Sequence, residues 1–312
     1  MGRQRLTVAL AAVELLDMFH SVDAAMVSLA RQRYAADRDT ATAMFLALEL
    51  GKPLFVEGAH GTGKTALATA LASALGASLI RLRCFEGMDP ERAAYSWDYA
   101  GQMSRMAAMA SMPPSRTASR FDLRAREFVI EGPLLKAISS TSTPPVLLVD
   151  DIERAGPAFE TFLAEFLERL TLEIPGAGVF RAVVEPRIVI ASRVAAPEVL
   201  SADAQYLWLD YPDYRREVDI VQAHVPGVGA GLSGEICNLV AAIRAGRFIR
   251  KPGIGETIDW ARALVALRRS SLDYDAVNET LGCLLRSPAD IRRFRREQFY
   301  ERAWEQRLDV SA

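Results

Sequence analysis

The sequence is poor in the residues that build disulfide frameworks and zinc sites. Its few thiols and imidazoles stand singly along the chain: Cys84, Cys237, Cys283, His20, His60 and His224. Because no CxxC or HxxxH pair occurs, neither a disulfide-stapled fold nor a zinc site is expected. Such cysteine usage suits a reducing compartment, and we expect a cytoplasmic protein.

Long uncharged runs are also missing. The longest covers 16 residues, from Thr65 to Ile80, and is rich in alanine and serine, so no transmembrane segment is predicted. The apolar stretch Leu6–Val13 follows two arginines, as the core of a signal peptide does. Glu14 and Asp17 interrupt the pattern directly afterwards, and an amphipathic helix explains it better.

Neither sign of charge dominates the chain. The 37 Lys and Arg residues against 39 Asp and Glu residues give a formal net charge of −2, which argues against bulk nucleic-acid binding. Half of the residues are hydrophobic and 24% are charged, so the chain can bury a core and is not disordered. At about 150 residues per domain, the length of 312 residues predicts two domains, or one large domain with a small appendage.

Hydrophobic patterning changes near Pro212. Before it, apolar runs alternate with helix-forming segments, and strands are expected at residues 53–57, 79–82, 146–149, 187–191 and 206–209. After it, helices alone are expected, at about 213–224, 233–246, 256–269, 273–285 and 288–307. Asp39 or Thr40 is expected to cap one helix, and Ser287 another. This order of strands and helices predicts an α/β fold, with a parallel sheet flanked by helices and followed by an all-α lid domain.

The strongest motif follows the first expected strand. Residues 58–65 read Gly-Ala-His-Gly-Thr-Gly-Lys-Thr, which fits GxxxxGK[ST] between a strand and a helix. Glycines let backbone N–H groups point at phosphate oxygens, and the helix amino terminus adds partial positive charge. Lys64 is expected to reach the β and γ phosphates, and Thr65 to ligate Mg²⁺. The predicted site for ATP and Mg²⁺ comprises Gly58, His60, Gly61, Thr62, Gly63, Lys64 and Thr65, with His60 as a variable loop position.

An aspartate pair ends the all-apolar strand at residues 146–149. Asp150 is expected to hold Mg²⁺, and Asp151 to orient or deprotonate the attacking water. The alternative is that both aspartates simply cap the helix that follows. With the glycine loop, they predict a P-loop NTPase domain over 39–212, between a helical extension over 1–38 and a lid domain with a C-terminal helix over 213–312.

Further segments agree with one group of such proteins. They are Ala43–Leu54, Arg81–Gly87, Tyr95–Tyr99, Gly132–Leu135, Val146–Ala155, Leu172–Gly176, Trp208–Pro212 and Glu256–Trp260. Together they resemble the MoxR group of AAA+ ATPases, closest to the accessory ATPases of molybdenum hydroxylase (carbon monoxide dehydrogenase) maturation. The resemblance runs from about Arg33 to Ser287. It implies a hexameric ring that uses ATP to remodel a protein client, with a von Willebrand factor A-domain protein as partner.

The residues that differ from the MoxR pattern lie at positions that the family uses for ATP hydrolysis. Asp151 replaces the catalytic Glu, and Arg193 falls where the family has a polar sensor Asn. Ala202 and Asp203 stand where paired arginines would reach a neighbour's γ-phosphate. Glu256 and Thr257 lie close to the expected lid arginine. Because an arginine finger contributes about 10³ to 10⁵ in rate, we expect weak or partner-dependent ATP hydrolysis.

Arg193 is the one departure that could compensate, by presenting a cation to the γ-phosphate in cis. The alternative is a solvated arginine after a strand. For the whole chain, a non-hydrolysing nucleotide-binding scaffold in a mixed ring stays open as a second function. A DNA-directed motor is a third, disfavoured by the acidic balance. Trp97 and Tyr99 lie just before an insertion at residues 100–130. They are expected either to contact a protein client as exposed aromatic side chains or to be buried against the sheet.

Overall fold

A computed structural model describes residues 19–110 and 122–300 of the chain. Its contacts divide the chain into two compact units. The α/β unit comprises Met1–Ser28, Asp37–Glu57 and Leu67–Trp208, and the helical unit comprises Leu29–Ala36, Gly58–Ala66 and Leu209–Ala312. Two short segments from the first quarter of the chain therefore pack with the C-terminal helices. The domain boundaries given above remain predictions.

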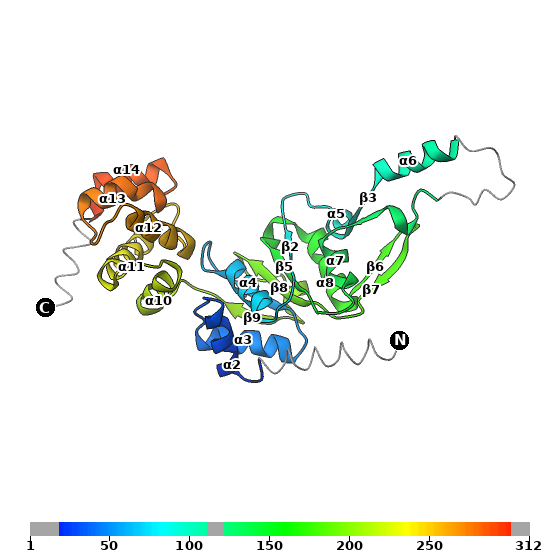
Figure 1. The fold of residues 1–312 in the computed structure, drawn as a ribbon, viewed down its shortest axis with the longest axis horizontal. Helices are drawn as coiled ribbons and strands as arrows, with labels where there is room; N and C mark the ends of the chain where they lie inside the picture. Colours follow the sequence, from blue (N-terminus) through cyan, green and yellow to red (C-terminus); the bar gives the residue numbers. More distant parts are fainter. Residues whose placement is uncertain (1–18, 111–121, 301–312) are drawn as a thin grey trace. The chain divides into compact units, whose positions relative to one another are not determined.

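The α/β unit is built on one parallel sheet of five strands (Figure 1). The strands are β1 (Leu54–Glu57), β2 (Leu79–Arg83), β5 (Val146–Asp150), β8 (Arg187–Ser192) and β9 (Gln205–Trp208), in the order β2-β5-β8-β1-β9. All neighbouring pairs are parallel, so the carboxyl ends of the strands share one edge of the sheet. The expected strands and the α/β class are confirmed.

β5 is buried along its whole length, as a strand is when helices cover both faces of its sheet. The helices of this part of the chain include α2 (Val22–Arg31), α3 (Arg38–Glu49), α4 (Lys64–Ala74), α7 (Pro133–Ser139), α8 (Pro157–Arg169) and α9 (Glu198–Ser201). Leu147 and Val149 share a core cluster with residues of α7 and α8. In Figure 1, α3 lies across the sheet from these two helices.

Short elements that the sequence did not predict extend the α/β unit. They are α5 (Pro90–Ala94), α6 (Tyr99–Ala110), the antiparallel pair β3 (Tyr95–Trp97) and β4 (Val129–Glu131), and the hairpin β6 (Thr171–Ile174) and β7 (Gly178–Arg181). Trp97 is half-buried and packs against the core. Tyr99, at the start of α6, is 68% exposed. The two aromatics thus have different environments.

The helical unit has its own core. Its C-terminal elements are α10 (Tyr214–His224), α11 (Ala230–Ala245), α12 (Ile254–Ala266), α13 (Tyr274–Thr280), η3 (Leu281–Cys283) and α14 (Pro288–Arg296). Trp260 is fully buried and donates its indole N–H to Thr280 Oγ1 at 2.6 Å. The helices expected after Pro212 are confirmed within the described residues. The last ends at Arg296, before the described part of the chain ends.

Two capping predictions are corrected. The N-cap of α3 is Asp37, whose carboxylate accepts from Thr40 N at 2.8 Å; Asp39 and Thr40 themselves lie inside the helix. Ser287 is the N-cap of α14, but its hydroxyl makes no capping hydrogen bond. The Asp290 carboxylate, in the first turn of α14, instead accepts from the backbone N–H groups of Ile249 and Arg250, in the loop between α11 and α12.

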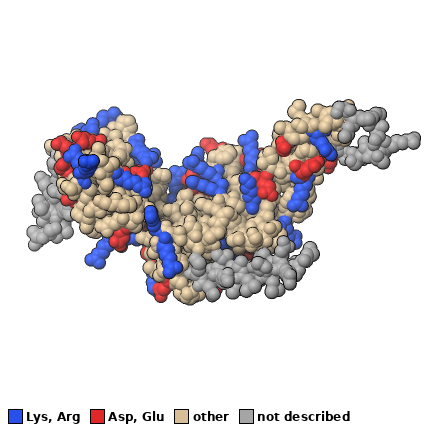
Figure 2. Space-filling model, in the orientation of Figure 1, with Lys and Arg blue, Asp and Glu red and all other residues tan. Residues whose placement is uncertain are grey.

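Charged side chains of both signs are interspersed on the visible surface (Figure 2). This distribution agrees with the near balance of charge in the sequence. Within the described residues, none of the helices combines the length and the apolar character that a bilayer crossing requires.

Candidate functional site

The glycine loop joins β1 to α4 in a conformation that its sequence permits. Gly61 and Gly63 have φ values of +79° and +102°, which side-chain-bearing residues adopt at a cost. A Cβ on Gly58 would lie 2.1 Å from the carbonyl oxygen of Leu209. The loop backbone therefore requires glycine at both glycine positions of the motif, Gly58 and Gly63, and also at Gly61.

Lys64 opens α4 and folds back over this loop. Its ammonium donates to the carbonyl oxygens of Gly58 at 2.6 Å and Ala59 at 2.7 Å. The Thr62 hydroxyl also donates to Ala59, at 3.1 Å. Lys64 is only 9% exposed, so its charge is held close to the loop backbone, where phosphate oxygens would be bound.

Other segments of the helical unit contact the same loop through residues that the motif does not identify. Ile254 N donates to Gly61 O at 2.8 Å, and the Tyr211 hydroxyl donates to His60 O at 2.9 Å. Arg250 Nη2 lies 3.3 Å from His60 Nε2. The two partners of His60 are 151 and 190 residues away in sequence, so no local pattern could have revealed them.

Gly61 and Gly253 bring two backbones into close approach. A Cβ on Gly253 would lie 2.5 Å from Gly61 Cα and 2.9 Å from Gly61 O. We expect Gly253→Ala to destabilise the protein by about 1–3 kcal/mol, because backbone must shift to admit the methyl group. Urea unfolding of the variant checks this.

Gly255→Ala is the matched control. Gly255 lies in α12, and a Cβ there meets no atom within 4 Å. The control should stabilise the protein by about 0.5–1 kcal/mol, as alanine does in an open helical position. Equal effects of the two substitutions would contradict the close approach.

The aspartate pair lies at the carboxyl edge of the sheet in the α/β unit. Asp150 ends β5, is 5% exposed and accepts from Arg81 Nη2 at 2.5 Å. Asp151 has a left-handed backbone with φ of +57° and makes no side-chain capping bond to the following η2 (Ile152–Arg154). The capping alternative therefore fails for Asp151. Its carboxylate lies 3.7 Å from Arg83 Nε and 3.9 Å from Arg193 Nε.

Arg193 follows β8 and pairs with a residue that the sequence did not single out. Its Nε lies 2.5 Å from Glu153 Oε1. Burial of the Glu153 carboxyl opposes ionisation, but the hydrogen bond and charge of Arg193 outweigh it and lower its pKa. The same hydrogen bond raises the pKa of Arg193. Arg193 is thus an ion-paired side chain and not simply a solvated one.

A buried thiol lies beside these carboxylates. Cys84 is fully buried, and its backbone N–H donates to Asp150 O at 2.8 Å. Burial, with the negative charges of Asp150 and Asp151, raises the pKa of this thiol to about 12. A thiol that remains protonated at neutral pH is a poor nucleophile and metal ligand.

Other residue types occupy the positions where the resemblance leads us to expect arginines. Ala202 and Asp203 follow α9. Glu256 Oε2 accepts from Gly253 N at 3.2 Å in the first turn of α12. Thr257 is fully buried among polar partners. Glu256 and Thr257 thus serve the packing of the helical unit.

The residues present fit a Mg²⁺-nucleotide. The glycine loop has left-handed residues at Gly61 and Gly63 and carries the Lys64 ammonium, and Asp150 of the α/β unit is a buried carboxylate. Across the described residues, no group of three or more His, Cys, Asp and Glu side chains could form an all-protein metal cage. Mg²⁺ normally keeps several waters and takes one or two protein ligands beside phosphates, so a cage is not required.

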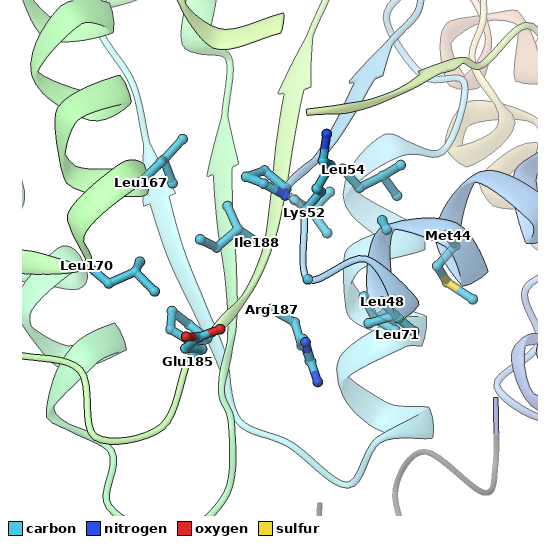
Figure 3. Close-up of a pocket in the computed structure, with 15 residues that line it drawn as sticks. Met44, Leu48, Lys52, Leu54, Leu71, Leu167, Leu170, Glu185, Arg187 and Ile188 are labelled. Carbon is cyan, nitrogen blue, oxygen red and sulfur yellow. The ribbon is translucent and has the colours of Figure 1, made fainter. Parts of the chain in front are cut away.

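A separate pocket of about 50 Å³ lies at the amino ends of β1 and β8 (Figure 3). Apolar side chains of α3, α4 and α8 surround it, with Lys52, Glu185 and Arg187 among them. In open α/β sheets, ligands bind at the carboxyl ends of the strands. The pocket is at the opposite edge from Asp150 and plays no part in the candidate site.

Part of the chain is similar in sequence or in fold to known proteins. Residues 53–202 match the model of the AAA domain (dynein-related subfamily). The Thermotoga maritima RuvB Holliday junction branch migration motor is 15% identical, with a TM-score of 0.44 over 79% of this chain and 68% of that one. A point mutant of the same RuvB gives 16% identity and a TM-score of 0.45 over 78% and 67%. No curated protein matches the sequence.

The matched segment contains the glycine loop, the aspartate pair and β1, β2, β5 and β8 of the parallel sheet. Residues 53–202 are therefore an AAA domain with the P-loop nucleotide-binding fold.

Proposed function

We propose that this chain binds ATP with Mg²⁺ and acts as a MoxR-type remodelling protein with weak or partner-dependent hydrolysis. The observation that carries the proposal is the loop at residues 58–65, with its left-handed glycines and its lysine folded over the backbone. Such a loop presents several N–H donors and one ammonium to an anion.

Each loop residue has a role in this proposal. The N–H groups of Gly58, Gly61 and Gly63 bind phosphate oxygens, with His60 and Thr62 lining the loop. Lys64 neutralises the β and γ phosphates.

Thr65 and Asp150 hold Mg²⁺, which draws charge from the phosphates when bound. Asp151 orients the attacking water and accepts its proton. Tyr34 lies beside Gly63, where a Cβ would be 3.8 Å from the tyrosine hydroxyl.

Slow turnover follows from the charges around Asp151. Its carboxylate is shorter than the family's Glu and already faces two guanidinium groups, from Arg83 and Arg193. Asp203 would bring negative charge, instead of the family's arginine, toward a neighbouring subunit's γ-phosphate. Negative charge there opposes the transition state.

The cellular role is proposed from the resemblance alone. It is chaperone-like maturation of a metalloenzyme in the cytoplasm, by a homo- or hetero-oligomeric ring acting with a von Willebrand factor A-domain protein. The client is a protein, such as a molybdenum hydroxylase, and not a nucleic acid. Exposed Tyr99, Met103 and Met106 on α6 offer the kind of adaptable apolar contact that suits a protein client.

A non-hydrolysing scaffold is the second candidate, and turnover assays separate the two. We expect slow ATP hydrolysis by the pure chain that rises with protein concentration. Asp151→Glu together with Asp203→Arg should accelerate turnover more than either change alone, and only in the assembled state, because the added arginine acts on a neighbour. Rapid turnover of the unmodified chain at every concentration would contradict the impaired-hydrolysis model. No turnover in the double variant would favour the scaffold.

A further inference from the structure

Four successive carbonyl groups of the glycine loop, those of residues 58–61, each accept a hydrogen bond. Lys64 Nζ donates to the first two, at 2.6 and 2.7 Å. The third accepts from the Tyr211 hydroxyl at 2.9 Å, and the fourth accepts from Ile254 N at 2.8 Å. All of these residues belong to the helical unit. The lysine of the motif therefore holds the first half of this segment, and residues outside the motif hold the second half.

The direction of each carbonyl group determines the direction of the next N–H group. A trans peptide group is planar, so its C=O and N–H point in opposite directions. The bond from Tyr211 to His60 O therefore orients the N–H of Gly61, and the bond from Ile254 orients the N–H of Thr62. In the part of the chain that the structure describes, neither of these two N–H groups donates a hydrogen bond. Both point away from their donors, as the N–H groups of an anion-binding backbone segment must.

Tyr211 is held by a second contact on its ring. The Arg244 guanidinium lies 4.3 Å from the ring centre, and Arg244 is itself bonded to the fully buried carboxylate of Glu217. Burial raises the pKa of Tyr211, although the Arg244 guanidinium opposes the shift. The hydroxyl therefore stays protonated at neutral pH and can donate to the loop.

The donor at Ile254 comes from the start of a helix. Ile254 is the first residue of α12, and the first N–H groups of a helix have no acceptor within that helix. The carbonyl oxygen of Gly61 is the acceptor for this one. One hydrogen bond therefore satisfies the helix terminus and orients the loop at the same time.

We propose that Tyr211 and Ile254 are positioning residues for nucleotide binding, which turn two consecutive peptide groups so that the N–H groups of Gly61 and Thr62 face the phosphates. The inference rests on the proposed function, since it concerns the same loop. It assigns part of the phosphate affinity to residues outside the motif. Because both bonds act on the loop backbone, their loss should weaken every ligand that carries a diphosphate by the same factor.

Calorimetric titration with ADP and with inorganic pyrophosphate, both with Mg²⁺, tests the proposal without measuring turnover. Tyr211→Phe removes the hydroxyl and keeps the ring beside Arg244. It should weaken both ligands about fivefold, the contribution of one hydrogen bond. Tyr214→Phe is the matched control, because the exposed hydroxyl of Tyr214 makes no hydrogen bond to the described residues. This control should leave both affinities unchanged.

Ile254→Pro removes the second donor. Proline is tolerated in the first turn of a helix, and the extended backbone of Gly253, with ψ of 179°, suits the residue before a proline. Ile254→Ala keeps the N–H group and measures what loss of the side chain costs. The proline variant should bind both ligands about fivefold more weakly than the alanine variant.

Thermal unfolding without ligand separates positioning from folding, and Tyr211→Phe should unfold at nearly the same temperature as Tyr214→Phe. If the unmodified chain binds neither ligand, the proposed function fails. If it binds both, but Tyr211→Phe and Ile254→Pro bind as tightly as their controls, the positioning role is wrong. A loss for ADP with unchanged pyrophosphate affinity would also overturn it, because Tyr211 would then act on the nucleoside and not on the loop backbone.

Discussion

Replacing Arg244 with alanine is expected to destabilise the helical unit by about 3–5 kcal/mol, because it leaves a buried carboxylate without its cation. Arg244 on α11 donates through Nη1 and Nη2 to the two carboxylate oxygens of Glu217 on α10, at 2.7 and 2.8 Å. Glu217 is fully buried. The geometry is bidentate, which makes this pair stronger and more specific than a single contact.

The other contacts of Arg244 link this pair to the loop before α12. Nε donates to Pro252 O at 2.8 Å, and the Thr257 hydroxyl donates to Glu217 Oε1 at 3.0 Å. The guanidinium also lies 4.3 Å from the centre of the Tyr211 ring. Pro252 precedes Gly253, and Tyr211 bonds to the glycine loop. Loss of Arg244 should therefore weaken nucleotide binding as well as stability.

Arg262→Ala is the matched control for the stability measurement. Arg262 pairs with Asp259 at 3.2 Å, but both side chains are more than half exposed, so its removal should cost no more than about 0.5 kcal/mol. Chemical denaturation of both variants gives the comparison. Arg244→Met combined with Glu217→Leu should recover much of the loss. A cost for Arg244→Ala as small as the control's would refute a role for the buried pair.

The sheet and the loop were predictable because their signals are local. An all-apolar run such as Val146–Val149 is typical of a strand buried on both faces, and β5 is such a strand. The GxxxxGK[ST] spacing requires particular backbone angles, and the left-handed Gly61 and Gly63 supply them. Strand, loop and helix also occur in the order that the motif needs.

The contacts that tune the candidate site were not predictable from the same signals. Glu153 and Arg193 meet because β5 and β8 are neighbours in the sheet, and strand order is a property of the whole fold. In the sequence, nothing distinguishes Gly253 from any other glycine that precedes a helix. In the structure, its backbone packs on Gly61. The antiparallel pair β3 and β4 has three residues per strand, too few to show a periodicity.

The capping error has a simple physical cause. Asp37, Asp39 and Thr40 all carry side chains that can accept a hydrogen bond from a helix N–H. Sequence alone does not determine which of them has the extended backbone of an N-cap. Asp37 has ψ of 173° and provides that geometry, so the helix begins earlier than expected.

Replacing Lys64 with alanine is expected to weaken binding of Mg²⁺-ATP about 100-fold. A hydrogen bond to a charged group contributes about 1.5–3 kcal/mol, and Lys64 is expected to serve two phosphates. The variant should also lose stability, because Gly58 O and Ala59 O lose the donor that now lies 2.6 and 2.7 Å from them. Calorimetry measures the first effect, and thermal unfolding without nucleotide measures the second.

Two further variants separate charge from geometry. Lys64→Arg keeps the positive charge, but a planar guanidinium cannot replace a compact ammonium that is 9% exposed between two carbonyl groups. It should therefore bind ATP nearly as poorly as the alanine variant. Lys136→Ala removes an exposed lysine from α7 and should leave affinity unchanged. Unaltered ATP affinity in Lys64→Ala would remove the glycine loop from the binding site, because no other lysine lies in that loop.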